Sequence, residues 1–165
     1  MIQIAVIGNK GPIPKTLEKL AEQVGAEIAQ VGAVLICGGA DGVMEAVCRG
    51  AKSQNGLTVG IFPFGSDEAN KFVDIRIPTQ IGFARNSIVA NSADAIIAVG
   101  GDVGTLIEIL YGVQYNKPVI LLDIPRTASG EIEKLLKQGL LSAAKFFSAK
   151  TAKEAVELAV EEAVA

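Results

Sequence analysis

A single carboxylate, that of Glu108, stands among leucines and isoleucines directly after a glycine-rich stretch. The stretch covers residues 100–105 and reads GGDVGT. Glu108 follows Gly104 by four residues, which places both on one helix face with the carboxylate one turn deeper. A carboxylate among apolar residues costs free energy unless it is paired or faces a cavity. Glu108 is therefore either a functional group or the one charge on the solvent-facing stripe of its helix.

Arg85 is the second charged residue whose position needs a reason. It falls in the opening turn of a helix predicted to start near Phe83. A cation at that end opposes the helix dipole, at a cost of about 0.3–1 kcal/mol. An arginine that binds an anion or pairs with Glu108 would belong there. A solvent-facing arginine is the other interpretation, and the sequence leaves both open.

The residue types that are present limit the chemistry. The chain has no histidine, which excludes Ser-His-Asp and Cys-His nucleophilic sites and histidine-rich metal sites. Cys37 and Cys48 are expected to be two thiols in the core rather than a disulfide. Acid–base chemistry must then come from Asp, Glu, Lys, Tyr or Cys. We predict no metal site and no cofactor that the protein requires.

Charge and hydropathy exclude further classes of function. The net charge of −3 argues against non-specific binding to nucleic acid, which needs clustered Lys and Arg. Every apolar run is interrupted before it reaches the length of a membrane helix. The first residues indicate a strand rather than the basic and apolar segments of a secretion signal. We therefore expect a soluble, cytoplasmic protein that binds neither nucleic acid nor a membrane.

Apolar strands alternate with helices along the chain. Strands are predicted at 2–8, 33–39, 57–63, 71–79, 93–101 and 117–123, with a short one near 145–149. Helices are predicted at 14–32, 42–54, 83–92, 104–115, around 130–138 and at 151–163. Continuous apolar strands separated by helices are typical of a parallel sheet covered on both faces. The prediction is a single α/β domain over residues 1–165, with a Rossmann-like, doubly wound parallel sheet. The stretch 62–72 is the most irregular and is expected to be a mobile loop.

Three predicted strands end in glycine. In a doubly wound sheet, ligands bind outside the carboxyl ends of the strands, where glycines let backbone amides approach an anion. Strand-to-helix turns also favour glycine without a ligand, but three such loops together favour a ligand site. Neither the spacing of a dinucleotide-binding turn nor a P-loop is present, so an ordinary NAD or ATP pocket is not expected. The candidate glycines are Gly8, Gly38, Gly39, Gly42, Gly100, Gly101 and Gly104.

Three polar residues in these loops have alternative roles. Asp41 and Asp102 each precede a predicted helix and could be its N-cap. The hydroxyl of Thr105 could bind a ligand oxygen or cap the same helix as Asp102. A carboxylate at Asp102 would repel a phosphate on this loop, although it could accept a hydrogen bond from a ribose or a pterin.

Three motifs resemble one protein family. Residues 100–108 (GGDVGTLIE) are similar to P-G-G-x-G-T-x-x-E, and residues 37–44 (CGGADGVM), which include Met44, are similar to G-G-G-x-x-G-[LV]-M. Arg85 precedes Asp94 of an "ADA" strand start by nine residues. The chain thus resembles the LONELY GUY and molybdenum-cofactor-carrier superfamily, often mislabelled as lysine decarboxylases and distantly related to DNA-processing protein A. The likeness covers roughly residues 2–125.

The resemblance implies a nucleotide or a phosphorylated pterin, such as the molybdenum cofactor, lying over the three glycine loops. In the hydrolase branch, the residues that match Arg85 and Glu108 cleave the N-glycosidic bond of a nucleoside 5′-monophosphate. Phosphoribohydrolases usually follow that arginine with lysine, whereas this chain has Asn86, which is closer to the carrier-like branch. We therefore predict a carrier-like binding protein, with Asn86 and Met44 among the ligand-binding residues. The alternative is a phosphoribohydrolase in which Arg85 and Glu108 are catalytic.

The predicted helix at 104–115 is apolar almost all round. One flank of such a helix needs a partner beyond its own domain. As in the family it resembles, we predict a homodimer or a higher homo-oligomer built from dimers.

Overall fold

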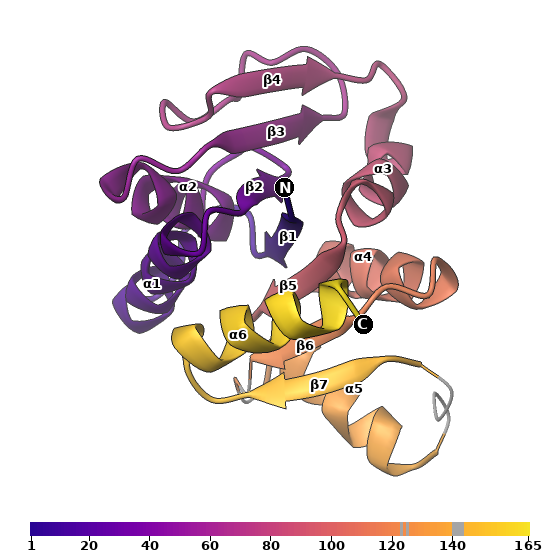
Figure 1. Ribbon diagram of the computed structural model, residues 1–165. Coiled ribbons are helices and arrows are strands. Elements are labelled where there is room, and N and C mark those ends of the chain that lie inside the picture. The colour runs from indigo at the N-terminus through magenta and orange to yellow at the C-terminus, as the bar shows by residue number, and fades with distance from the viewer. Residues whose placement is uncertain (123, 125, 140–143) are drawn as a thin grey trace.

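The computed structural model describes residues 1–122, 124, 126–139 and 144–165. Within them, seven parallel strands form one sheet in the order β4-β3-β2-β1-β5-β6-β7 (Figure 1). The predicted single α/β domain with a doubly wound, Rossmann-like sheet is confirmed. The strands are β1 (Gln3–Gly8), β2 (Val34–Cys37), β3 (Thr58–Phe62), β4 (Ile75–Pro78), β5 (Ala95–Val99), β6 (Val119–Leu122) and β7 (Phe146–Ala149).

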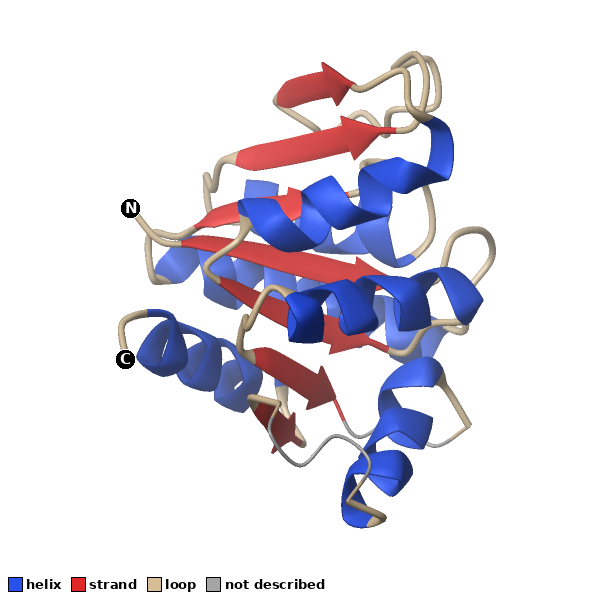
Figure 2. Ribbon diagram, turned by 90° about the vertical axis from the view of Figure 1, so that its right-hand side faces the viewer, coloured by secondary structure: helices blue, strands red, loops and turns tan. Residues whose placement is uncertain are grey.

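Helices cover both faces of the sheet (Figure 2). One face carries α1 (Lys15–Gln30), α2 (Val43–Ser53) and α6 (Ala152–Ala163). The other face carries α3 (Arg85–Ser92), α4 (Val103–Gln114) and α5 (Ala128–Lys137), with the short 3₁₀ turn η1 (Gly82–Ala84) leading into α3. Among the described residues, no helix is both long and apolar enough to cross a membrane.

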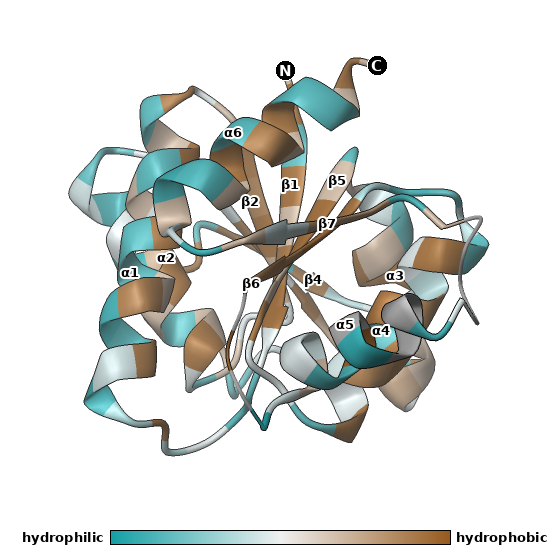
Figure 3. Ribbon diagram, turned by 90° about the horizontal axis from the view of Figure 1, so that it is seen from below, coloured by the Kyte–Doolittle hydropathy of each residue, from teal (hydrophilic) through white to brown (hydrophobic). Residues whose placement is uncertain are grey.

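The central strands are mostly hydrophobic, as Figure 3 shows. Every residue of β2, β5 and β6 is buried, because helices shield both of their faces. On one side of the sheet, α1 and α2 approach so closely that glycine is required. A Cβ atom on Gly25 would lie 1.9 Å from the carbonyl oxygen of Val47, and one on Gly50 would lie 1.9 Å from that of Glu22.

The two cysteines lie in the core beside the sheet. Cys37 ends β2 and Cys48 belongs to α2, and both are fully buried. Their Sγ atoms are 3.6 Å apart and carry no disulfide. The prediction of two core thiols is confirmed.

The chain reverses its direction of winding between β1 and β5. β1 pairs with β2 on one side and with β5 on the other, and Gly8 stands opposite Val99 at the carboxyl ends. Successive connections therefore leave the sheet in opposite directions at this point, which opens a crevice there. The same end of the sheet holds the glycine loops that follow β1, β2 and β5.

The predicted elements are present, with differences at their ends. The fourth strand begins at Ile75 rather than at residue 71, because residues 70–74 form a turn. In this turn the Thr58 hydroxyl donates a hydrogen bond to the Phe72 carbonyl and accepts one from the Asp74 amide. All four residues of β4 are exposed, as expected of an edge strand. Residue 123 of the predicted strand 117–123 lies outside the described residues.

Candidate ligand-binding site

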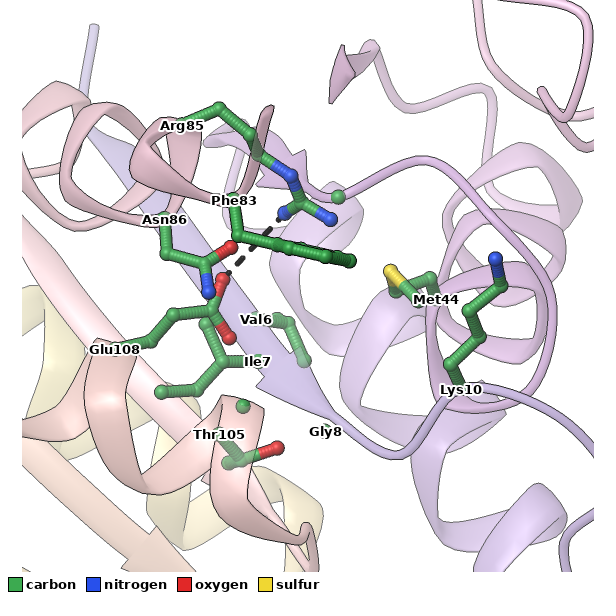
Figure 4. Close-up of a pocket in the computed structure, with 12 residues that line it drawn as sticks. Val6, Ile7, Gly8, Lys10, Met44, Phe83, Arg85, Asn86, Thr105 and Glu108 are labelled. Carbon is green, nitrogen blue, oxygen red and sulfur yellow. Dashed lines mark ion pairs between the residues drawn. The ribbon is translucent and has the colours of Figure 1, made fainter. Parts of the chain in front are cut away.

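A cavity of about 130 Å³ opens at the carboxyl ends of β1 and β2, between α3 and α4 (Figure 4). β1 supplies its floor, the two helices supply Arg85 and Glu108, and the loop after β1 supplies Lys10. The small volume suits part of a ligand, such as a phosphate or a sugar, because sites for whole drug-sized ligands are about 300–1,000 Å³. The lining residues are Val6, Ile7, Gly8, Lys10, Gly38, Met44, Phe83, Arg85, Asn86, Gly104, Thr105 and Glu108.

Arg85 and Glu108 meet in this cavity. Arg85 is the first residue of α3, and Glu108 lies in the second turn of α4. Their atoms Nη1 and Oε1 are 3.6 Å apart, and the two side chains are only 12% and 9% exposed. Figure 4 shows the pair at one wall of the cavity. The alternatives in which either residue faces solvent alone are therefore wrong.

The burial of Glu108 changes its acidity. The pKa of this carboxyl is raised from its ordinary value of 4.5 to about 7, chiefly because burial removes solvent; the charge of Arg85 opposes the rise, and that of Asp102 adds to it. At neutral pH the group is therefore divided between its charged and its protonated form. A carboxyl in this state can accept or donate a proton during a reaction, or accept or donate a hydrogen bond to a ligand.

Two buried polar atoms at this site have no partner within the described part of the chain. They are Nε of Arg85 and the hydroxyl Oγ1 of Thr105. A buried donor without a partner costs about 1–3 kcal/mol, so such atoms are rare in folded proteins unless a ligand or water completes them. Both residues line the same cavity. The Thr105 hydroxyl does not cap its helix. Of its two predicted roles, a hydrogen bond to a ligand oxygen stays a prediction.

Gly38 lets the guanidinium lie against the loop after β2. A Cβ atom at this position would come within 2.6 Å of Sδ of Met44 and 2.7 Å of Nη1 of Arg85. Gly8 is similarly crowded, because a Cβ there would lie 2.6 Å from the carbonyl oxygen of Val99. Both glycines thus shape the cavity by the absence of a side chain.

The loop after β5 already uses two of its own amides. The side chain of Asp102 accepts a hydrogen bond of 3.1 Å from the amide of Gly104, which confirms Asp102 as the N-cap of α4. The amide of Gly101 donates to Oδ1 of Asn9 at 2.8 Å. A phosphate on this loop would face the Asp102 carboxylate and would compete with it for the Gly104 amide.

Comparison with protein families decides where the chain belongs. The family model described as the SLOG cluster4 family matches residues 1–156. The chain belongs to the SLOG cluster4 family. This membership confirms the resemblance to the LONELY GUY and molybdenum-cofactor-carrier superfamily.

Relatives of this SLOG cluster4 protein come from both branches of the superfamily. A protein of Archaeoglobus fulgidus is 46% identical over 130 residues, which cover 79% of this chain and 85% of the relative. The cytokinin riboside 5′-monophosphate phosphoribohydrolase of Mycobacterium tuberculosis is 33% identical, over 73% of this chain and 70% of its own. The solved structure of the molybdenum cofactor binding protein from Rippkaea orientalis has a TM-score of 0.87 and 35% identity, and covers 99% of this chain and 98% of its own.

The SLOG cluster4 protein brings eight of the predicted site residues to the cavity. They are Gly8, Gly38, Met44, Arg85, Asn86, Gly104, Thr105 and Glu108. The other five lie outside its lining, and a direct role of theirs in binding stays a prediction. They are Gly39, Gly42, Gly100, Gly101 and Asp102. All four of these glycines have positive φ, between 69° and 104°, so each has a backbone reason to be glycine.

One predicted cap in the SLOG cluster4 protein is wrong. The N-cap of α2 is Gly42, at φ 70°, rather than Asp41. The Asp41 carboxylate instead accepts a hydrogen bond of 3.0 Å from the amide of Gly11, in the loop after β1. The side chain therefore ties two loops together and leaves the first turn of α2 without a side-chain cap.

The sequence analysis did not predict two residues that line this SLOG cluster4 site and could contact a ligand. Lys10 comes two positions after the strand-ending Gly8, and Phe83 comes two before Arg85, and both line the cavity. A lysine directly after a strand-ending glycine was an available signal, because that position lies at the ligand end of the sheet. Phe83 carries no such signal in the sequence, since an aromatic residue near a helix start is usually part of the core.

Proposed function

We propose that this SLOG cluster4 protein binds a phosphorylated nucleotide or pterin in the cavity between α3 and α4. One observation carries the proposal: two buried polar atoms, Nε of Arg85 and Oγ1 of Thr105, have no protein partner among the described residues, and both belong to side chains of residues that line the same cavity. A ligand rich in oxygen would supply what both atoms lack.

Each polar side chain has a role in this proposal. The guanidinium of Arg85 donates charge-assisted hydrogen bonds to phosphate oxygens, for which its planar fork is well suited. The Thr105 hydroxyl donates to a further phosphate or sugar oxygen. Glu108 holds Arg85 in place and, when ionised, accepts a hydrogen bond from a ligand hydroxyl. Asn86 adds an amide that can both donate and accept.

A phosphorylated pterin such as the molybdenum cofactor suits these groups as cargo. Its phosphate needs a cation and hydroxyl donors, which Arg85 and Thr105 offer. The likeness to the molybdenum cofactor binding protein of Rippkaea orientalis, 35% identical over nearly the whole chain, supports this ligand class. Asn86 after Arg85, and Asp102 in the glycine loop, favour binding without turnover.

Hydrolysis of a nucleoside 5′-monophosphate is the second candidate function. The observation that favours it is the buried ion pair in which the pKa of Glu108 is raised to about 7. Cleavage of an N-glycosidic bond passes through a cationic ribosyl centre, which a carboxylate can stabilise while it helps water to attack. The relative from Mycobacterium tuberculosis is a phosphoribohydrolase, which supports this alternative.

One experiment separates the two candidates. The purified protein is titrated by calorimetry with GMP, AMP and cytokinin riboside 5′-monophosphate, and each mixture is then analysed for free base by chromatography. We expect binding without base release, and at least tenfold weaker binding in Arg85→Ala. Arg76→Ala, which removes an exposed arginine on β4, is the matched control and should bind as the wild type does.

Other outcomes would contradict the proposal. Rapid base release that is lost in Glu108→Gln would establish the hydrolase instead. Binding that Arg85→Ala leaves unchanged would move the ligand away from this cavity. If the wild type neither binds nor cleaves any of the three nucleotides, and also fails to bind a phosphorylated pterin, both candidates are wrong.

A further inference from the structure

A second and larger cavity adjoins the first. Its volume is about 390 Å³, and Phe62 at the end of β3 and the loop that follows it, residues 63–68, form most of its wall. Lys10 and Phe83 line both cavities and therefore mark their common border. A ligand whose phosphate reaches Arg85 can thus extend past Phe83 into the larger space.

Aromatic rings line this second cavity. Phe62, Phe64 and Phe83 are three of the six phenylalanines in the chain. Phe62 is buried, whereas Phe64 and Phe83 are 59% and 78% exposed. Exposed phenylalanines beside a cavity offer flat apolar faces, which suit a heteroaromatic ring because ring systems stack on them with little sequence or substituent preference.

One backbone hydrogen bond joins the two segments that carry the exposed rings. The amide of Gly82 donates to the carbonyl of Pro63 at 2.9 Å. Phe83 directly follows Gly82, and Phe64 directly follows Pro63, so this bond joins the two segments that carry the rings. A Cβ atom on Gly82 would be 3.6 Å from Cζ of Phe64, which places the Phe64 ring against the start of η1. Gly82 has φ 63°, a conformation that favours glycine, and this turn directs the chain into η1.

Two carboxylates, those of Asp67 and Glu68, line the same cavity. Glu68 pairs with Lys10 at 2.7 Å, but both side chains are more than half exposed, so this ion pair is weak and a ligand can replace it. Within the described ranges no group donates a hydrogen bond to the Asp67 side chain. The cavity therefore combines aromatic faces with acceptors for hydrogen bonds.

This combination selects among ring systems. A 2-amino-4-oxopyrimidine ring, as in guanine and pterin, presents an N–H and an amino group side by side, and one carboxylate accepts both. The corresponding edge of adenine has a ring nitrogen that is itself an acceptor and that a carboxylate repels. The acidic side chains thus favour guanine or pterin over adenine.

We propose that the cavity bordered by Phe64, Phe83 and Asp67 is the ring subsite, and that it takes a 2-amino-4-oxopyrimidine ring. The inference rests on the proposed function, since it places the phosphate of the same ligand beside Arg85. When the ligand binds, Lys10, at the border, leaves its ion pair with Glu68 and pairs with the phosphate instead. Glu68 then joins Asp67 as an acceptor for the ring.

The test compares ligands that differ by single groups. GMP, IMP and AMP are titrated by calorimetry, because IMP lacks only the 2-amino group of GMP. Neopterin phosphate, followed by its own fluorescence, tests the pterin ring. The protein variants are the double variant D67N/E68Q, Phe83→Ala and, as a control, Glu157→Gln, which removes an exposed carboxylate on α6.

We expect the wild type to bind GMP or neopterin phosphate at least tenfold more tightly than IMP and AMP. D67N/E68Q should bring the affinity for GMP to within threefold of that for IMP. The GMP-to-IMP ratio is the readout, because the loss of two negative charges and the release of Lys10 should strengthen the binding of both phosphates. Phe83→Ala should weaken the binding of every ring ligand, and Glu157→Gln should leave the binding of all of them unchanged. If GMP is favoured over neopterin phosphate, the ring belongs to a nucleotide, and the reverse order assigns it to a pterin.

Four results would overturn the ring subsite. Equal binding of GMP, IMP and AMP that still requires Arg85 contradicts it and leaves the proposed function intact. A preference for AMP contradicts it in favour of an adenine ligand. A change in native mass in Phe83→Ala, without a change in ring affinity, assigns the exposed ring to a subunit interface. Absence of binding to every ligand overturns the ring subsite and the proposed function together. A ring preference that persists while Arg85→Ala leaves the affinity unchanged overturns only the position proposed for the phosphate.

Discussion

The guanidinium of Arg85 lies 3.6 Å from the carboxylate of Glu108, and the two residues come from different helices on the same face of the sheet. Each charge is poorly placed when it is considered alone. Arg85 opposes the dipole of α3, and Glu108 is buried among apolar residues of α4. Together they form a buried pair at the ligand end of the sheet, which explains both positions and defines the candidate site.

The raised pKa of Glu108 links the stability of the fold to pH. The folded protein keeps this proton up to about pH 7, whereas the unfolded chain releases it near pH 4.5. Stability from the protonated group is therefore present below pH 4.5 and is lost as the pH rises to about 7. The shift corresponds to about 3 kcal/mol. Urea denaturation of wild type and Glu108→Gln at pH 4.5, 6 and 8 measures it.

We expect the free energy of unfolding of Glu108→Gln to rise relative to wild type by about 3 kcal/mol between pH 4.5 and 8. The absolute difference at one pH also contains the lost pairing with Arg85, so only its change with pH is diagnostic. A difference that stays constant over this range would show that Glu108 ionises in the folded protein as it does in water.

Two glycine substitutions should separate binding from folding. In Gly38→Ala the new Cβ meets only the ends of the Met44 and Arg85 side chains, which can move. We expect less than about 1 kcal/mol of lost stability but weaker GMP binding, because the guanidinium is displaced. In Gly50→Ala the Cβ meets the backbone oxygen of Glu22, so α1 and α2 must separate at a cost of about 1–3 kcal/mol or more.

Urea denaturation and calorimetry with GMP measure these two variants. Gly50→Ala should retain the affinity of the wild type at temperatures where it is folded. The assignment fails if Gly38→Ala binds GMP normally, or if it is as unstable as Gly50→Ala.

Asp102→Asn should strengthen phosphate binding without loss of the helix cap. Asparagine caps helices about as well as aspartate, so the free energy of unfolding should change by less than about 0.5 kcal/mol. Removal of the negative charge lowers the repulsion of a phosphate and also lowers the pKa of Glu108, which Asp102 now helps to raise. Calorimetry with GMP should show several-fold tighter binding. Unchanged or weaker binding would mean that the Asp102 carboxylate contacts the ligand favourably.

The outer face of α4 leads to a prediction on assembly. Val103, Ile107 and Leu110 are 72%, 42% and 45% exposed on this helix, so the expected burial on most sides is not achieved within one chain. An exposed apolar stripe of this kind indicates a protein interface. Light scattering at micromolar concentration should give at least the mass of a dimer, and Ile107→Glu should reduce it. A monomeric wild type would contradict the prediction.

Local patterns were sufficient to predict the fold and to place Glu108 near the glycine loops, but they left open whether Arg85 pairs with it. Continuous apolar strands gave the parallel sheet, and the four-residue spacing from Gly104 placed Glu108 near the glycine loops because helical geometry is regular. The Asp102 cap followed from its position directly before a helix. Asp41 has the same local signal but bonds to Gly11 across the fold, so only the tertiary structure could show that it is no cap.

The ring-sized cavity could not be predicted for the same reason. Residues 62–68 have no regular pattern, and their role depends on the hydrogen bond from Gly82 to Pro63, which joins segments far apart in the sequence. That contact joins the segments from which Phe64 and Phe83 line one cavity. The stretch 62–72 was predicted to be mobile, and its motion stays a prediction.

Mass spectrometry of small molecules that co-purify with the native protein tests the central claim most directly. Wild type, Arg85→Ala and Arg76→Ala are purified in parallel without oxygen, and the released molecules and any molybdenum are quantified. A phosphorylated nucleotide or pterin should accompany wild type and Arg76→Ala and should be at least tenfold depleted in Arg85→Ala. A wild type that carries no such molecule above background, or an Arg85→Ala variant that carries the same amount, would contradict a ligand site between Arg85 and Glu108.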